Sequence, residues 1–131
     1  MKRTVLLNAE LSYLIATLGH GDMVVIGDAG LPVPNGVRRI DLALMPGMPA
    51  VGDVLQAVLS EMQVERAMIA TEAVTANHGH MPPWCRPLGG TPVDQVSHAD
   101  FKALTGQAKA VIRTGECTPY ANAILYAGVV F

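Results

Sequence analysis

The apolar positions of the chain recur with helical spacing in two stretches, residues 9–18 and residues 51–62. In both stretches hydrophobic side chains return every three or four residues, which places them on one face of a helix. Asn8 can cap the start of the first helix and Gly19 can end it. The pattern therefore predicts two amphipathic helices, each about three turns long.

Shorter apolar runs between and after these helices predict strands. They lie at residues 23–26, 39–44, 67–71, 109–113 and 123–131. The first is too short and too rich in β-branched residues for a helix, and the second alternates between polar and apolar positions. Strands that alternate with helices indicate a three-layer α/β/α fold, and a chain of 131 residues is expected to form a single domain, residues 1–131.

The pattern is lost between Glu72 and Asp94, where Asn, His, Gly and Pro are frequent. We expect a loop there. After it, Ser97 can cap a short helix over residues 98–104, with Asp100 at the third position of a capping-box pattern.

The composition adds an excess of apolar residues to this picture. Half of the residues are hydrophobic and only 15% are charged, which is more apolar surface than a small domain hides on its own. We therefore expect both a sheet covered by helices and apolar surface shared with other subunits.

Charge and hydropathy exclude some kinds of partner. The net charge is −2 and the basic residues are scattered, which argues against nucleic-acid binding. No apolar run approaches the roughly 20 residues that span a bilayer, and Asn8 and Glu10 interrupt the only stretch that resembles a signal peptide. Two distant cysteines, Cys85 and Cys117, favour reduced thiols and a cytoplasmic protein.

The strand at 23–26 has His20 before it and Asp28 after it. His20 follows directly on the first helix, where the negative end of the helix dipole favours a protonated imidazole. One interpretation is a general acid or base together with a carboxylate that binds hydroxyl groups. The alternative is a surface histidine and an aspartate that caps a turn.

A second candidate region is the loop that ends in Tyr120-Ala121-Asn122. Phenol and amide groups both donate and accept hydrogen bonds, so they suit sugar hydroxyls. The alternative is a surface tyrosine and a capping asparagine. His98, at the start of the predicted 98–104 helix, is by itself an ordinary polar residue of a first turn.

His78, His80 and Cys85 loosely resemble a zinc motif, but no second paired motif supplies further ligands, so we expect no metal site. Cys117 has no base at a fixed spacing and is not expected to act as a nucleophile.

Several of these segments together resemble the signature of the D-ribose pyranase and fucose mutarotase family (RbsD/FucU). The matching segments are Asn8-x-Glu10, Leu18-Gly-His20-x-Asp22, Asp28-Ala-Gly-Leu-Pro-x-Pro-Asn35, Glu61-Met-x-Val-Glu65, Ala67-x-Ile-Ala-Thr-Glu72 and, almost verbatim, residues 110–125. The resemblance covers nearly the whole chain outside Ala73–Val93. Leu31 before Pro32 resembles the ribose branch, since the fucose branch typically has an aromatic residue there.

This resemblance implies a mixed central sheet and an isomerase that interconverts the pyranose and furanose forms of D-ribose without a cofactor. His20 matches the proton donor of the family. Asp28, His98 and the segment Tyr120-Ala121-Asn122 match its sugar-binding positions. The family commonly forms decamers of two stacked pentameric rings with sites near subunit contacts. Two alternatives stay open: a mutarotase for L-fucose or another monosaccharide, and a sugar-binding protein without turnover.

Overall fold

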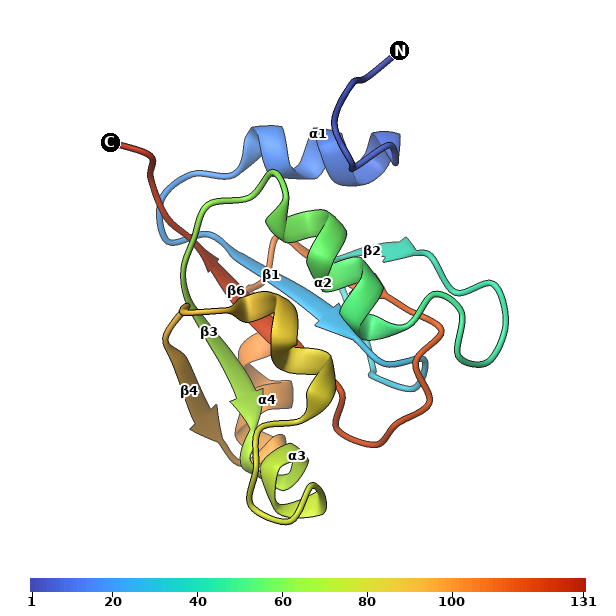
Figure 1. The fold of residues 1–131 in the computed structure, drawn as a ribbon, viewed down its shortest axis with the longest axis vertical. Coiled ribbons are helices and arrows are strands. Elements are labelled where there is room, and N and C mark those ends of the chain that lie inside the picture. The colour runs from blue at the N-terminus through green and yellow to red at the C-terminus, as the bar shows by residue number, and fades with distance from the viewer.

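A mixed six-stranded sheet forms the centre of the molecule (Figure 1). The computed structural model describes all of residues 1–131. The strands are β1 (Met23–Gly27), β2 (Arg38–Asp41), β3 (Val64–Ala70), β4 (Val93–Val96), β5 (Ala110–Arg113) and β6 (Ala123–Ala127). Their order across the sheet is β2-β5-β1-β6-β3-β4.

Strand direction decides which loops meet. β5 runs parallel to both β1 and β2, β3 runs parallel to β4, and β6 is antiparallel to its neighbours β1 and β3. The carboxyl ends of β1 to β5 and the amino end of β6 therefore share one edge of the sheet, which we call the carboxyl edge. The opposite edge, where β1 begins and β6 ends, is the amino edge.

Helices cover both faces of the sheet. One face packs against α1 (Ala9–Thr17), α2 (Val51–Leu59) and the 3-10 helix η1 (Pro83–Leu88), and these elements share a core cluster of 21 buried residues. The other face carries α4 (His98–Leu104), which lies behind the sheet in Figure 1 and buries Phe101 in a smaller cluster. A short helix, α3 (Thr71–Ala76), follows β3 directly at the carboxyl edge, and a 3-10 turn, η2 (Thr105–Gln107), follows α4.

The three-layer α/β fold with a mixed sheet is confirmed. The two helix starts predicted from capping residues, at Asn8 and Ser97, are also confirmed. The side chain of Asn8 accepts a hydrogen bond from the Leu11 amide at 3.0 Å, and the Ser97 hydroxyl accepts one from the Asp100 amide at 3.1 Å. Both helices begin where these residues predict.

The prediction of a loop over residues 72–94 is wrong, because α3, η1 and the edge strand β4 lie there. β4 pairs only with β3, and its two central residues, Asp94 and Gln95, are exposed, so it lacks the apolar alternation of a half-buried strand. In η1, Pro83 occupies the first turn, where a missing amide hydrogen costs nothing.

Several predicted boundaries also extend too far. The strand expected over residues 39–44 ends at Asp41, whose carboxylate accepts a hydrogen bond from the Ala43 amide at 3.0 Å and turns the chain. The helix expected to reach residue 62 ends at Leu59, and the last strand ends at Ala127 instead of residue 131.

Candidate active site

Asp28 and Asn122 meet at the carboxyl edge because β1 ends there and its neighbour β6 begins there. The Asp28 amide donates a hydrogen bond to Asn122 Oδ1 at 2.7 Å, and Asn122 Nδ2 donates to Asp28 Oδ2 at 2.9 Å. The Gly30 amide donates to the other carboxylate oxygen, Oδ1, at 2.9 Å. Asn122 is completely buried, whereas Asp28 is half-buried. The carboxylate of Asp28 is therefore held in one orientation from two sides.

Gly27 and Thr114 support this arrangement. A side chain on Gly27 would place its Cβ 2.7 Å from Leu31 Cδ2 and 3.3 Å from Asn122 Oδ1, so the close packing requires glycine. The buried Thr114 hydroxyl donates to the Gly27 carbonyl at 2.8 Å. These contacts fix the end of β1 directly before Asp28.

Tyr120 and Ala121 form a tight turn directly before Asn122. Tyr120 has a φ of 63°, in the left-handed region, and its carbonyl accepts a hydrogen bond from the Asn122 amide at 2.8 Å. Ala121 is fully buried. This turn directs Asn122 inward toward Asp28 and leaves the Tyr120 phenol to line a pocket.

His98 approaches the same region from the start of α4. Its ring packs edge-on against Tyr120 at 5.1 Å between centroids and lies nearly parallel to Phe101 at 6.3 Å. The His98 Nδ1 atom is buried and has no hydrogen-bond partner within the chain. A buried polar atom without a partner is costly, so a hydroxyl group bound beside Tyr120 would be a favourable partner for it.

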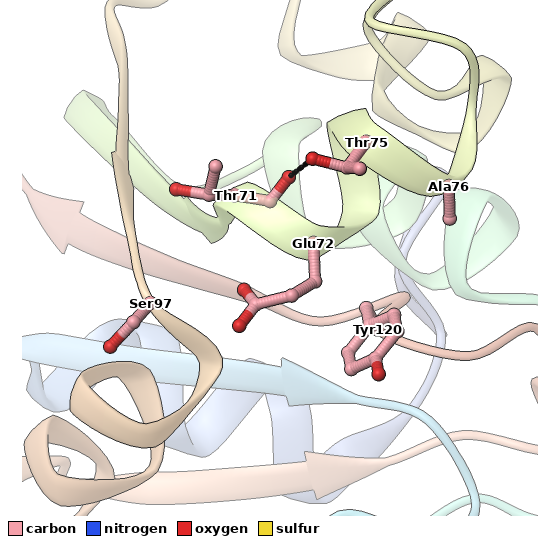
Figure 2. A pocket seen from close by; sticks show the side chains of 6 residues that line it. All are labelled: Thr71, Glu72, Thr75, Ala76, Ser97 and Tyr120. Carbon is pink, nitrogen blue, oxygen red and sulfur yellow. Dashed lines mark hydrogen bonds between the residues drawn. The ribbon is translucent and has the colours of Figure 1, made fainter.

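A pocket of about 580 Å³ opens beside these residues, between α3 and the loops that follow β4 and precede β6. Its lining residues are Thr71, Glu72, Thr75, Ala76, Ser97 and Tyr120. In Figure 2 the Glu72 carboxylate points into the space between Ser97 and Tyr120. The volume and the polar lining are suitable for a monosaccharide.

Glu72 lines this pocket and was not among the candidate residues predicted from the sequence. Its two carboxylate oxygens accept hydrogen bonds from the His98 amide at 3.1 and 2.9 Å. Hydrogen bonds from its own amide and from the His98 amide hold the pKa of Glu72 below its usual range. The signal was its position, since it lies at the carboxyl end of β3, where ligands of α/β proteins bind.

Glu116 shapes the loop that leads to Tyr120. One of its oxygens accepts hydrogen bonds from the Cys117 and Thr118 amides, both at 3.1 Å, and the other accepts one from the Val51 amide at 3.3 Å. Partial burial by itself raises the pKa of Glu116, but these hydrogen bonds outweigh burial and the pKa is lowered.

His20 lies at the opposite edge of the sheet from all these residues. It precedes β1, whereas Asp28 follows it, and a strand of five residues spans roughly 17 Å. The His20 side chain is 61% exposed, and its Nε2 lies 2.8 Å from Glu65 Oε2. The structure thus brings together Asp28, His98, Tyr120, Ala121 and Asn122 but leaves His20 at the amino edge.

The residues considered for zinc do not gather. His78 and His80 are exposed, while Cys85, a residue of η1, is buried in the core, and burial raises its pKa to about 12. No group of three or more His, Cys, Asp or Glu side chains lies close enough to hold a metal ion. No helix combines the length and apolar character needed to cross a bilayer.

Comparisons with known proteins show which family the chain belongs to. A D-ribose pyranase of Variovorax paradoxus is 65% identical over 132 residues, and one of Symbiobacterium thermophilum is 56% identical over 131, each match covering both chains completely. The structure of Bacillus subtilis RbsD complexed with D-ribose superposes with a TM-score of 0.92 at 48% identity, covering all of both chains.

The fucose mutarotase of Streptococcus pneumoniae, solved with L-fucose, shares the fold at a TM-score of 0.73 but is only 20% identical, with full coverage of both chains. Residues 1–130 match the model of the RbsD / FucU transport protein family. This protein is therefore a member of the RbsD/FucU family.

Proposed function

We propose that this protein is a D-ribose pyranase, in which residues 1–131 form one sugar-isomerase domain. It interconverts β-D-ribopyranose and β-D-ribofuranose by opening and reclosing the sugar ring, and it needs no cofactor. The observation that carries this proposal is the cluster of hydroxyl-binding groups at the carboxyl edge, centred on Asp28, Tyr120 and Asn122. Full-length relatives that are 51–66% identical bear the name D-ribose pyranase, and the RbsD structure at 48% identity contains D-ribose.

The chemistry requires one proton donor and one proton acceptor. Ring opening breaks the bond between the anomeric carbon and the ring oxygen, which needs a proton on that oxygen while the anomeric hydroxyl loses one. In our proposal His20 donates the first proton. Asp28, Tyr120 and Asn122 hold the remaining hydroxyls, so that a different hydroxyl attacks the aldehyde on reclosure.

The distance between the two edges implies that a second copy of the chain completes the site. His20 of one subunit lies too far from Asp28 of the same subunit to share a sugar with it. If the amino edge of one subunit faces the carboxyl edge of the next, each sugar contacts both groups. Such a contact joins two different surfaces, and contacts of this kind form a ring when the rotation between neighbouring copies closes.

Exposed apolar residues support an assembly of this kind. They include Val5, Leu7, Leu44, Met45, Val130 and Phe131, whose exposed fractions in the isolated chain range from 57% to 100%. We propose a decamer of two stacked pentameric rings. We further propose a cytoplasmic location, which fits the two free cysteines.

Complementation between inactive variants tests the shared site. His20→Ala and Asp28→Ala are each expected to be inactive in pyranose–furanose exchange, measured by NMR saturation transfer on D-ribose. When the two variants are co-expressed, about a quarter of the sites in mixed rings regain both groups, and activity returns.

The matched control is the pair Asp28→Ala and His98→Ala, which alters one edge only and is expected to stay inactive. Failure of the first pair to regain activity would contradict a site built from two chains. Faster exchange of L-fucose than of D-ribose with the wild-type protein would instead favour the mutarotase alternative.

A further inference from the structure

The amino edge contains a local irregularity in β3. In the antiparallel pairing with β6, Val64 lies opposite Ala127 and Arg66 lies opposite Tyr126, so Glu65 is an extra residue without a partner. This is a β-bulge, a feature that turns one side chain out of the regular alternation of the strand and is frequent near active sites. The side chain that it redirects is the carboxylate of Glu65.

Gly128, the residue directly after β6, makes room for this bulge. A side chain on Gly128 would place its Cβ 3.2 Å from Glu65 Cβ and 3.4 Å from the Glu65 amide nitrogen. The Gly128 amide also donates a hydrogen bond to the Gln63 carbonyl at 2.9 Å. Glycine at this position therefore lets the chain pass close to Glu65 and fixes the bulge.

The turn that carries His20 is anchored to the same point of β6. The Gly21 amide donates to the Ala127 carbonyl at 2.8 Å, and the Ala127 amide donates to the Asp22 carbonyl at 2.9 Å. Asp22 also accepts a hydrogen bond from the Gly19 amide at 2.9 Å. The backbone after His20 is thus tied to Ala127, the residue opposite the bulge, and the backbone before His20 is tied to the Asp22 side chain.

The bulge at Glu65 and the anchored turn at His20 bring His20 Nε2 to 2.8 Å from Glu65 Oε2. The side chains are 61% and 42% exposed, and ion pairs as exposed as this one add little to stability. A bulge, a closely packed glycine and an anchored turn therefore converge on a contact that stability alone does not explain.

We propose that Glu65 is a positioning residue for His20. By accepting a hydrogen bond from Nε2–H, the carboxylate fixes the ring and leaves Nδ1 as the nitrogen that exchanges protons with the sugar. This inference rests on the proposed function, in which His20 is the proton donor.

The proton balance of the cycle follows from this assignment. On opening, the Nδ1–H bond breaks and a new O–H bond forms at the departing ring oxygen, while the anomeric hydroxyl passes its proton to a water molecule and becomes the aldehyde carbonyl. On reclosure, Nδ1 takes the proton of the attacking hydroxyl, and the carbonyl oxygen receives the proton that the water had accepted. Nε2 keeps its hydrogen throughout, bound to Glu65.

The test compares Glu65→Gln with Glu10→Gln, which removes an exposed carboxylate that pairs with Arg38 at 3.2 Å and not with His20. In Glu65→Gln we expect kcat for ribose exchange to fall about tenfold or more with KM unchanged, because proton transfer and not sugar binding is impaired. Glu10→Gln should match the wild type. Gly128→Ala, which pushes on Glu65, should resemble Glu65→Gln.

A second readout does not depend on activity. Long-range ¹H–¹⁵N correlations at about pH 9, where imidazoles are neutral, should show hydrogen on Nε2 of His20 in the wild type and a mixture of tautomers in Glu65→Gln. Hydrogen on Nδ1 in the wild type, or unchanged kcat in Glu65→Gln, would overturn the inference. If His20→Ala is fully active, the proposed role of His20 fails instead, so the two failures are distinguishable.

Discussion

The two ends of strand β1 differ in how many contacts their functional side chains make within one chain. At the carboxyl end, Asp28 is held by Asn122 and Gly30, and Asn122 is completely buried. At the amino end, His20 projects into solvent and contacts one carboxylate, that of Glu65. The proposed sugar-binding groups are held by hydrogen bonds within one subunit, while the proposed proton donor is exposed.

This difference fits the proposed site, in which one subunit binds the sugar and the next supplies the proton donor. Hydroxyl groups are recognised by several hydrogen bonds at once, which requires donors and acceptors that are fixed before the sugar binds. A proton donor needs only one correctly placed atom. An exposed histidine at one edge can therefore serve a pocket on the next copy, provided that its ring orientation is fixed locally, as the contact with Glu65 allows.

The largest expected effect separates catalysis from stability at the amino end. His20→Ala should slow ribose exchange by about 10²–10⁴-fold, the usual contribution of a general acid or base. The free energy of unfolding should change by less than about 0.5 kcal/mol, because the side chain is 61% exposed. Saturation-transfer NMR and urea unfolding measure the two quantities. Unchanged exchange in the variant would contradict the role of His20.

The next effect concerns stability at the carboxyl end. Asn122→Ala leaves the Asp28 amide and carboxylate without their buried partner, so the free energy of unfolding should fall by roughly 1–3 kcal/mol. The matched control is Asn77→Ala, whose amide donates to the His80 and Met81 carbonyls in an exposed turn. It should change stability by less than about 0.5 kcal/mol. Equal losses in both variants would show that burial of Asn122 is unimportant.

The smallest effect is a dependence of stability on pH through Glu116. Because its pKa is lowered in the folded protein, its contribution to stability is present above the ordinary value of 4.5 and is lost as the pH falls through the lower folded value. Glu116→Gln should therefore lose less stability than the wild type when unfolding is compared at about pH 6 and pH 3. Parallel losses would show that the hydrogen bonds to Val51, Cys117 and Thr118 do not depend on the charge.

Much of the fold could be predicted because its signals are local. Asn8 and Ser97 mark the starts of α1 and α4, since a capping side chain acts within three residues of itself. β1 was predictable because it is buried on both faces and reads as a continuous apolar run. β4 was missed because an exposed edge strand keeps polar residues at its centre, and its strand character comes only from pairing with β3.

For the candidate site, too, some features could be predicted from local sequence and others could not. The sequence by itself determined which groups are available, namely the histidines, the carboxylates and the segment Tyr120-Ala121-Asn122, and their spacing pointed to the family. Only the tertiary structure decided which of them meet. Asp28 and Asn122 are 94 residues apart and pair because β1 and β6 are antiparallel neighbours. Glu72 enters the pocket because β3 ends at the same edge.

His20 is only eight positions before Asp28, yet an extended strand keeps them apart. Proximity along the chain did not become proximity in space, because β1 carries its two ends to opposite edges of the sheet.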